Sequence, residues 1–296
     1  QVHTQDAFSR LLRRGNISFT GIYDIQASLK RLEIGGVLNA TELLRVLSIL
    51  KVAKRVKSYG RTERGEEIVD SLAPMFDALE PISNLAIEIE RCIITENEIA
   101  DDASPGLRGV RRSIHSLNEK IRSQMNAMLN SPAHKTHLQD NVITMRNGRY
   151  CLPVKSESKG QIPGMIHDQS SSGSTFFIEP MAVVKMNNDL SELFVKEQEE
   201  IEIVLANLSN DVGEHIDSMK TNLHTLTHLD FIFAKGFLAR EHNGSRPLFN
   251  TNGIIRIRQG RHPLIDKKNV VPIDIHLGDD FDSLIITGPN TGGKTV

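Results

Sequence analysis

The sequence predicts a mainly α-helical fold with a small β insert and the start of an α/β phosphate-binding domain toward its carboxyl end. Three observations predict it. An apolar seam with helical spacing runs without proline from residue 181 to about 240. Residues 141–180 change to the two-residue period of strands. The final residues spell G-x-x-x-x-G-K-T from Gly288 to Thr295, directly after an apolar run.

Composition and charge narrow the functional class. Charged residues make up 24 % of the chain and apolar residues 39 %, which is typical of a helix-rich globular protein. The net charge of −2 gives no global attraction for nucleic acid, so such a partner requires local basic clusters. Two clusters occur, with solvated helix faces as the alternative interpretation: one between Lys51 and Arg64, and one at Arg108, Arg111 and Arg112.

The expected location is the cytoplasm, with no membrane partner. No apolar run approaches the ~20 residues that a membrane-spanning helix needs. The two cysteines, Cys92 and Cys151, lie in apolar surroundings without metal-ligand spacing, so we expect reduced, buried thiols.

Residues 1–140 are predicted to be helical. Asn39 followed by Glu42 has the spacing of a capping box, and Ser104 before Pro105 has that of a cap followed by a first-turn proline. From Leu107 to Met128, apolar residues recur about every 3.5 positions. This second helix therefore requires a long helical partner.

The partner is predicted downstream, between residues 181 and 243. One unbroken helix from residue 181 to about 240 would be about 80 to 90 Å long at ~1.5 Å per residue, and would pair antiparallel with the earlier helix. Two shorter helices broken near Gly213 are the alternative.

Residues 141–180, between the two helices, are predicted to form strands. The sequence Arg146-Asn147-Gly148-Arg149 predicts a hairpin with a type I′ turn, and further strands are expected near 164–167 and 175–178. These flank a loop, 169–174, whose hydroxyls and amides suit phosphate, although Ser and Gly also serve tight turns. The candidate nucleic-acid contacts are Arg146, Arg149, Lys155, Lys159, Ser171 and Ser172. Neighbouring His167 and Asp168 are given no catalytic role.

Residues 244–296 change to an α/β pattern. A strand is expected at 254–257, a turn at 260–265, and a buried strand from Ser283 to Thr287 that leads into the phosphate loop. In such a loop, backbone N–H groups surround phosphate, Lys294 neutralises its charge and Thr295 holds Mg²⁺. The nucleotide-binding candidates are Gly288, Pro289, Asn290, Thr291, Gly292, Gly293, Lys294 and Thr295.

These motifs together carry a family resemblance. The phosphate loop, preceded by Gly260-Arg261-His262-Pro263, resembles the ATPase entry of the MutS family. The Thr291 variant, the stretch from Ile166 to Ser174 and the stretch from Phe177 to Pro180 are similar to its second bacterial branch, here called MutS-two. Further similar stretches at 11–15, 28–31 and 35–38 extend the resemblance over nearly the whole chain.

The resemblance implies an architecture and a set of ligands. It implies a helical core with long antiparallel lever helices, a β-rich clamp at their tip and the start of an ABC-type ATPase that dimerises around ATP and Mg²⁺. Val271, within 270–272, is then expected near the adenine, with an ordinary core strand as the alternative. The implied regions are 1–140 (core and first lever helices), 141–180 (clamp), 181–243 (returning lever helix) and 244–296 (part of the ATPase).

The resemblance also implies a function. MutS-two proteins act on branched DNA to suppress recombination and carry an Smr endonuclease domain, without the mismatch-reading domain of the wider family. The alternative is a ribosome-binding ATPase that splits collided ribosomes, with rRNA as a ligand, and a helical scaffold with a regulatory phosphate loop is a third possibility. Because this chain lacks the remaining ATPase motifs, we expect it to be a fragment of a homodimeric parent protein. We expect the parent to be an ATPase and endonuclease, and the fragment to have no ATPase activity.

Overall fold

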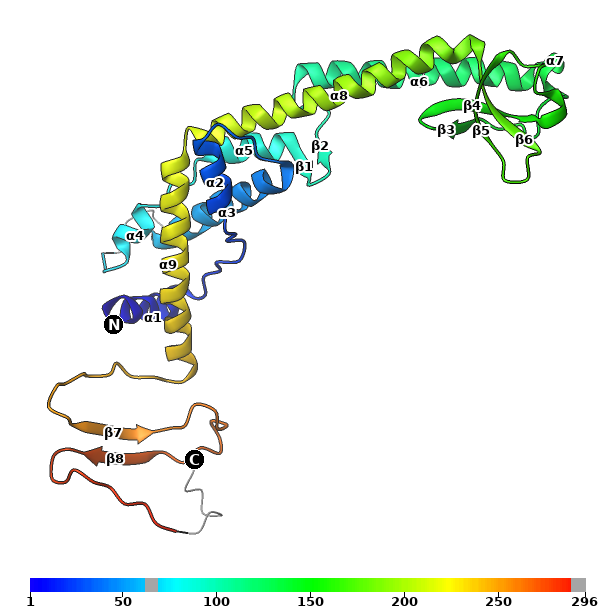
Figure 1. The fold of residues 1–296 in the computed structure, drawn as a ribbon. Coiled ribbons are helices and arrows are strands. Elements are labelled where there is room, and N and C mark those ends of the chain that lie inside the picture. The colour runs from blue at the N-terminus through cyan, green and yellow to red at the C-terminus, as the bar shows by residue number, and fades with distance from the viewer. Residues whose placement is uncertain (62–68, 289–296) are drawn as a thin grey trace. The chain divides into compact units, whose positions relative to one another are not determined.

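The computed structural model describes residues 1–61 and 69–288 (Figure 1). The described residues divide into two compact units. The larger unit comprises residues 19–59 and 77–226. The smaller unit comprises the described residues of 1–18, 60–76 and 227–296. None of the helices in the described ranges is long and apolar enough to cross a membrane.

The larger unit contains a helical core with one small hairpin. Its first elements are α2 (Gln26–Glu33), α3 (Ala40–Gly60), α5 (Ser83–Cys92), β1 (Ile93–Thr95) and β2 (Glu98–Ile99). The predicted capping box at the start of α3 is confirmed, because Glu42 N donates to Asn39 Oδ1 and Asn39 N donates to Glu42 Oε2, both at 3.0 Å. The β1–β2 hairpin lies in the region predicted to be only helical.

Two long helices of the larger unit, α6 (Pro105–Asn130) and α8 (Met181–Gly213), pack side by side and antiparallel (Figure 1). The predicted cap of α6 is confirmed, since Leu107 N donates to Ser104 Oγ at 2.9 Å. Arg111 fixes the pairing at one end through an ion pair with Glu197 at 2.7 Å. At the other end, Ile121 and Met125 are buried with Leu190 in one apolar cluster.

The second long helix is not continuous. α8 ends at Gly213, and α9 (Ile216–Glu241) begins three residues later. The prediction of one unbroken helix is therefore wrong, and the two-helix alternative is correct. Gly213 is a weak helix former with open space around it, so nothing compensates there for its conformational entropy. At ~1.5 Å per residue, the 33 residues of α8 extend about 50 Å.

A four-stranded antiparallel sheet lies between α6 and α8 in the chain. Its strand order is β3-β4-β6-β5. The elements of this region are α7 (Pro132–Lys135), β3 (Thr144–Arg146), β4 (Arg149–Lys155), the 3₁₀ turn η1 (Ser156–Ser158), β5 (Gly164–Gln169) and β6 (Thr175–Pro180). The predicted type I′ turn is confirmed by positive φ angles of 51° at Asn147 and 75° at Gly148.

The smaller unit contains α1 (Val2–Arg14), most of α4 (Ala73–Asp77), the second half of α9, and the hairpin of β7 (Ile255–Gly260) and β8 (Ile273–Leu277). Arg10 is its central polar residue. Its guanidinium is only 3 % exposed, pairs with Asp70 at 2.6 Å and lies 4.5 Å from the centre of the Phe76 ring. Phe76 in turn packs edge-on against Phe233 of α9.

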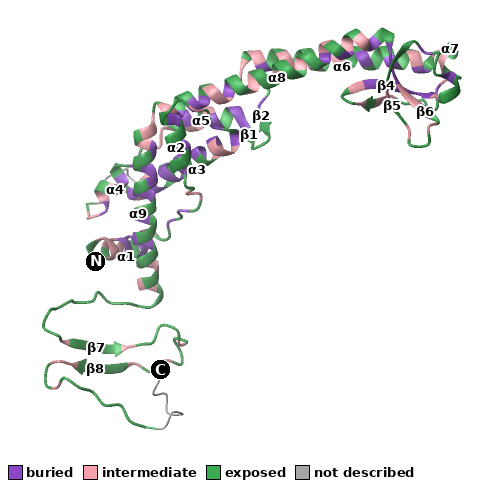
Figure 2. Cartoon of the chain, viewed as in Figure 1, coloured by how far each residue is buried: buried purple, intermediate pink, exposed green. Residues whose placement is uncertain are grey.

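The buried strand predicted from Ser283 to Thr287 is not formed. These residues adopt no regular structure, and Leu284, Ile285 and Ile286 are 47 %, 84 % and 63 % exposed. A buried parallel strand needs flanking strands and covering helices. Among the residues up to 288 that the structure describes, the β7–β8 sheet has two strands and is itself largely exposed (Figure 2).

Candidate nucleic-acid interface

The sheet is held on α6 and α8 by an apolar face. Tyr150, Leu152 and Val154 of β4 and Ile178 of β6 are buried in the same cluster as α6 and α8 residues. The alternation along β4 and β6 places these side chains on one face of the sheet. The neighbouring positions, including Arg149, Cys151 and Phe177, therefore belong to the opposite face. Three of the predicted contact residues, Arg146, Arg149 and Lys155, lie there.

A buried carboxylate organises this second face. Glu179 of β6 is fully buried, and its oxygens lie 2.8 Å from Arg149 Nη1, 2.7 Å from Asn187 Nδ2 and 2.5 Å from His167 Nε2. Burial alone would raise the pKa of Glu179, but the hydrogen bonds from Asn187, His167 and Arg149 hold the pKa below its ordinary value. The carboxylate therefore stays ionised at neutral pH and joins three elements: β4, β5 and α8.

The two arginines predicted as nucleic-acid contacts are both matched by carboxylates. Arg149 pairs with Glu179 and also donates to Asn188 Oδ1 at 2.6 Å. Arg146 lies 3.1 Å from Asp168 and stacks on Phe177, with 3.9 Å between its guanidinium carbon and the ring centre. Their role as phosphate contacts remains a prediction, and the structure gives each a structural role as well.

The two predicted lysines contact a carbonyl oxygen and an aromatic ring. Lys155 donates to the carbonyl oxygen of Thr136 at 3.1 Å, and Lys159 lies 4.8 Å from the centre of the Phe176 ring. Within the described part of the chain, neither ammonium has a carboxylate at ion-pair distance. Both lysines therefore carry net positive charge at this end of the sheet.

The loop at residues 169–174, here called the serine loop, lies beside these lysines. Ser156 N donates to Ser174 O at 3.0 Å, which joins the segment after β4 to the loop between β5 and β6. The loop is a closed turn: Gly173 N donates to Ser170 O at 2.8 Å, and Gly173 has a φ of 74°. Turn formation thus explains the glycine. Ser171 and Ser172 are exposed, and the Ser172 hydroxyl is within 2.8 Å of the Ser174 hydroxyl.

Sequence reasoning assigned no role to Glu179 or Asn187. The sequence does hold a signal for Glu179, because it is the one acid in the otherwise uncharged strand Thr175–Pro180. A carboxylate in such a strand is buried only where hydrogen-bond or ion-pair partners surround it. Asn187 had no comparable signal. Its amide also reaches the backbone of Tyr150, at 3.3 Å from the carbonyl oxygen, and this contact spans 37 positions of sequence.

The predicted nucleotide site is described only at its edges. Gly288 is described, with a φ of 141°, whereas Pro289, Asn290, Thr291, Gly292, Gly293, Lys294 and Thr295 lie outside the described residues. Val271 is 78 % exposed and precedes β8, so the interpretation of 270–272 as a core strand is wrong. A hollow of about 570 Å³ brings together the turn 260–263, Val270, and the basic residues Arg258 and Lys267.

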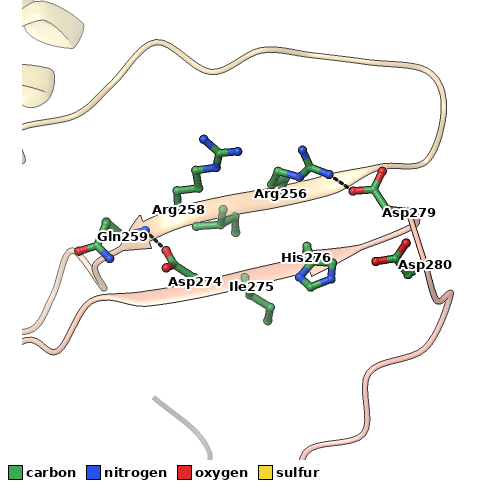
Figure 3. A pocket seen from close by; sticks show the side chains of 9 residues that line it. Arg256, Arg258, Gln259, Asp274, Ile275, His276, Asp279 and Asp280 are labelled. Carbon is green, nitrogen blue, oxygen red and sulfur yellow. Dashed lines mark hydrogen bonds and ion pairs between the residues drawn. The ribbon is translucent and has the colours of Figure 1, made fainter.

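The β7–β8 hairpin carries a second hollow of about 420 Å³ (Figure 3). Two of its charged residues, Arg256 and Asp279, form an ion pair, and Gln259 N donates to Asp274 Oδ1 at 2.6 Å. Arg258 points toward neither of these carboxylates in Figure 3. Of the predicted phosphate loop, the described residue Gly288 does not line this hollow.

Comparison with known proteins gives strong matches along the chain, although a scan against protein-family models finds none. The chain is 58 % identical over 296 residues to a protein of Agathobacter rectalis called "Endonuclease MutS2", covering 100 % of this chain and 37 % of that relative. It is 55 % identical to the protein of the same name from Lachnoclostridium phytofermentans, covering 100 % of this chain and 38 % of the relative, and 54 % identical to the one from Lachnospira eligens, covering 99 % and 37 %.

The chain thus spans a little over a third of the length of these relatives. The matched region extends over the sheet with its serine loop and, at its far end, over the residues that carry the phosphate-loop motif. Along its whole length, the chain belongs to the MutS2 family.

Proposed function

We propose that this chain grips the DNA backbone through the sheet, as part of an ATP-dependent clamp protein of the MutS2 type. The observation that carries the proposal is the end of the sheet where Lys155 and Lys159 lie beside an exposed serine loop, neither of them paired with a carboxylate of residues 1–61 or 69–288. Lysines and hydroxyls are the groups that contact phosphate oxygens without reading base sequence. The relatives' name, an endonuclease, agrees with a nucleic-acid substrate.

The affinity of such a contact for DNA depends on salt concentration in a way that can be calculated. Each phosphate neutralised by a cation contributes about −0.9 to the slope of log K against log salt concentration for duplex DNA. Replacing Lys155 and Lys159 together by alanine removes two such contacts. We therefore expect the slope to become shallower by about 1.8.

The test is fluorescence anisotropy of labelled duplex and four-way-junction DNA with the whole chain across a salt series. The matched control is Lys185→Ala with Lys196→Ala, which removes the same charge from exposed positions of α8. The proposal predicts a shallower slope for the Lys155 and Lys159 pair alone. Equal slopes for wild type and this pair would overturn the assignment of the sheet as the contact.

We further infer that ATP and Mg²⁺ bind the phosphate loop, with Lys294 against phosphate, Thr295 on the metal and Val271 near the adenine. The sequence motif supports this inference, as does the hollow that joins the turn 260–263 to Val270. Calorimetric titration of ATP into the longer protein, with and without Mg²⁺, tests it beside the variant Lys294→Ala. Unchanged affinity in that variant would exclude the loop as the site.

The remaining activities of the longer protein are proposals of the same kind. We infer a homodimer that acts on branched DNA, suppresses recombination and carries its endonuclease in the part of the relatives that this chain does not cover. Light scattering of the longer protein tests the dimer, and cleavage of junction DNA tests the nuclease. The ribosome alternative has no support from the relatives' name, and stronger binding to ribosomes than to either DNA would favour it.

A further inference from the structure

Helices α6 and α8 differ in the charge that they expose. The exposed residues of α6 include four cations (Arg108, Arg112, Lys120 and Arg122) and one carboxylate (Glu119). The exposed residues of α8 include two cations (Lys185 and Lys196) and four carboxylates (Glu192, Glu199, Glu202 and Asp211). The pair therefore presents a basic side and an acidic side.

The inner contact between the helices leaves the outer charges available. Arg111, which is 23 % exposed, is neutralised by Glu197 of α8 and by Asp101. Arg108 is 3.7 Å from Asp102, and both are about half exposed, so this pair is weak. Arg112 and Arg122 have no carboxylate at ion-pair distance among the residues that the structure describes. Separated by ten positions, they lie about 15 Å apart along the axis and within about 80° of each other around it.

The two sides also differ in apolar surface. Helix α6 exposes no large apolar side chain, whereas α8 exposes Phe194, Val195 and Ile203 at 44 %, 60 % and 50 %. Protein–protein contacts are anchored by buried apolar and aromatic groups, so the α6 face lacks what a protein partner requires. Its other exposed residues include Ser113, Ser116 and Ser123, which donate hydrogen bonds to phosphate as readily as to water.

We propose that the exposed face of α6 is a second contact surface for duplex DNA, on which the phosphate backbone runs along the helix while the acidic side of α8 faces away. From Arg108 to Arg122 the face is about 21 Å long at ~1.5 Å per residue, which equals the axial rise of about six base pairs of duplex DNA at 3.4 Å each. The inference rests on the proposed DNA function, and it assigns DNA a path along the helix in addition to the sheet.

The experiment compares three double variants of the whole chain by salt-dependent anisotropy with the same duplex. Arg112→Ala with Arg122→Ala removes two charges from α6, Lys185→Ala with Lys196→Ala removes two from α8, and Lys155→Ala with Lys159→Ala removes two from the sheet. The four helix positions are exposed and alanine is the best helix former, so the helices remain folded, which circular dichroism verifies.

For the α6 pair we expect a slope shallower by about 1.8 and, at 0.1 M salt, affinity lower by a factor of about 60. For the α8 pair we expect no loss. A normal slope in the α6 pair together with a shallower slope in the sheet pair overturns this inference and keeps the proposed function. Equal losses in the α6 and α8 pairs indicate only general charge and overturn it as well. Absence of wild-type binding at 50 mM salt overturns both.

Discussion

Replacing the buried carboxylate Glu179 by glutamine should destabilise the sheet by about 2 kcal/mol. The change conserves size, so no cavity forms, but the charge is lost and one of the two acceptor oxygens becomes an amide nitrogen that donates. A hydrogen bond to a charged group contributes about 1.5–3 kcal/mol and a neutral one about 0.5–1.5, a difference of about 1 kcal/mol for each of the three donors. Arg149 is 25 % exposed and regains water when its partner is neutral, which lowers the sum to about 2 kcal/mol.

The assay must report on the sheet, because two compact units need not unfold together. Native-state amide hydrogen exchange of β4, β5 and β6 gives a local free energy of opening. Glu157→Gln is the matched control, since Glu157 is exposed on the segment that directly follows β4. A loss below about 0.5 kcal/mol for Glu179→Gln, equal to that of the control, would refute the assignment of Glu179 as the organising group.

The same carboxylate predicts a pH dependence with a defined sign. The pKa of Glu179 in the fold lies below its ordinary value of 4.5, so its ionised form stabilises the fold. This contribution is complete above about pH 4.5 and is lost as the pH falls through the lowered pKa. Protection of the sheet should therefore decline more steeply with acid in the wild type than in Glu179→Gln, and parallel curves would contradict this.

Three further predictions concern local structure. Gly164→Ala should destabilise the sheet by more than about 2 kcal/mol in urea denaturation, because a Cβ atom there would lie 2.2 Å from a carbonyl oxygen of β6, whereas Gly160→Ala, with open space around it, should change stability by less than about 0.5 kcal/mol. Ser104→Ala should cost about 1 kcal/mol in the same assay, through loss of the α6 cap. Burial raises the pKa of both Cys92 and Cys151 to about 11, so neither thiol should react with a disulfide reagent at pH 8 until urea unfolds the protein, and rapid labelling of the native chain would contradict this.

The local parts of the fold were predictable from the sequence because short-range chemistry determines them. The caps at Asn39 and Ser104 and the turn at Asn147-Gly148 depend on residues within four positions of one another. The β5–β6 hairpin around the serine loop followed from the same turn chemistry. In each case the side chain or backbone that satisfies the requirement is adjacent in sequence.

The predictions that were wrong concern elements whose structure depends on residues far away in the sequence. Periodicity alone did not decide between one helix and two at Gly213, since the apolar seam continues across the break. The strand at 283–287 has the composition of a buried strand, but a strand forms only where a neighbouring strand accepts its hydrogen bonds. For the candidate site, the sequence predicted the basic residues but not their ion pairs. Asp168 pairs with Arg146 and Glu179 pairs with Arg149, across 22 and 30 positions of sequence.

The junction between β6 and α8 has a mechanical consequence. β6 ends at Pro180 and α8 begins at Met181, so no slack chain separates them, and the Glu179–Asn187 hydrogen bond ties the strand to the second turn of the helix. A force on the outer loops of the sheet is therefore transmitted along the roughly 50 Å of α8, because the sheet does not rotate freely about the start of this helix. Bending is easiest at residues 214–215, between α8 and α9, because the helix is interrupted there.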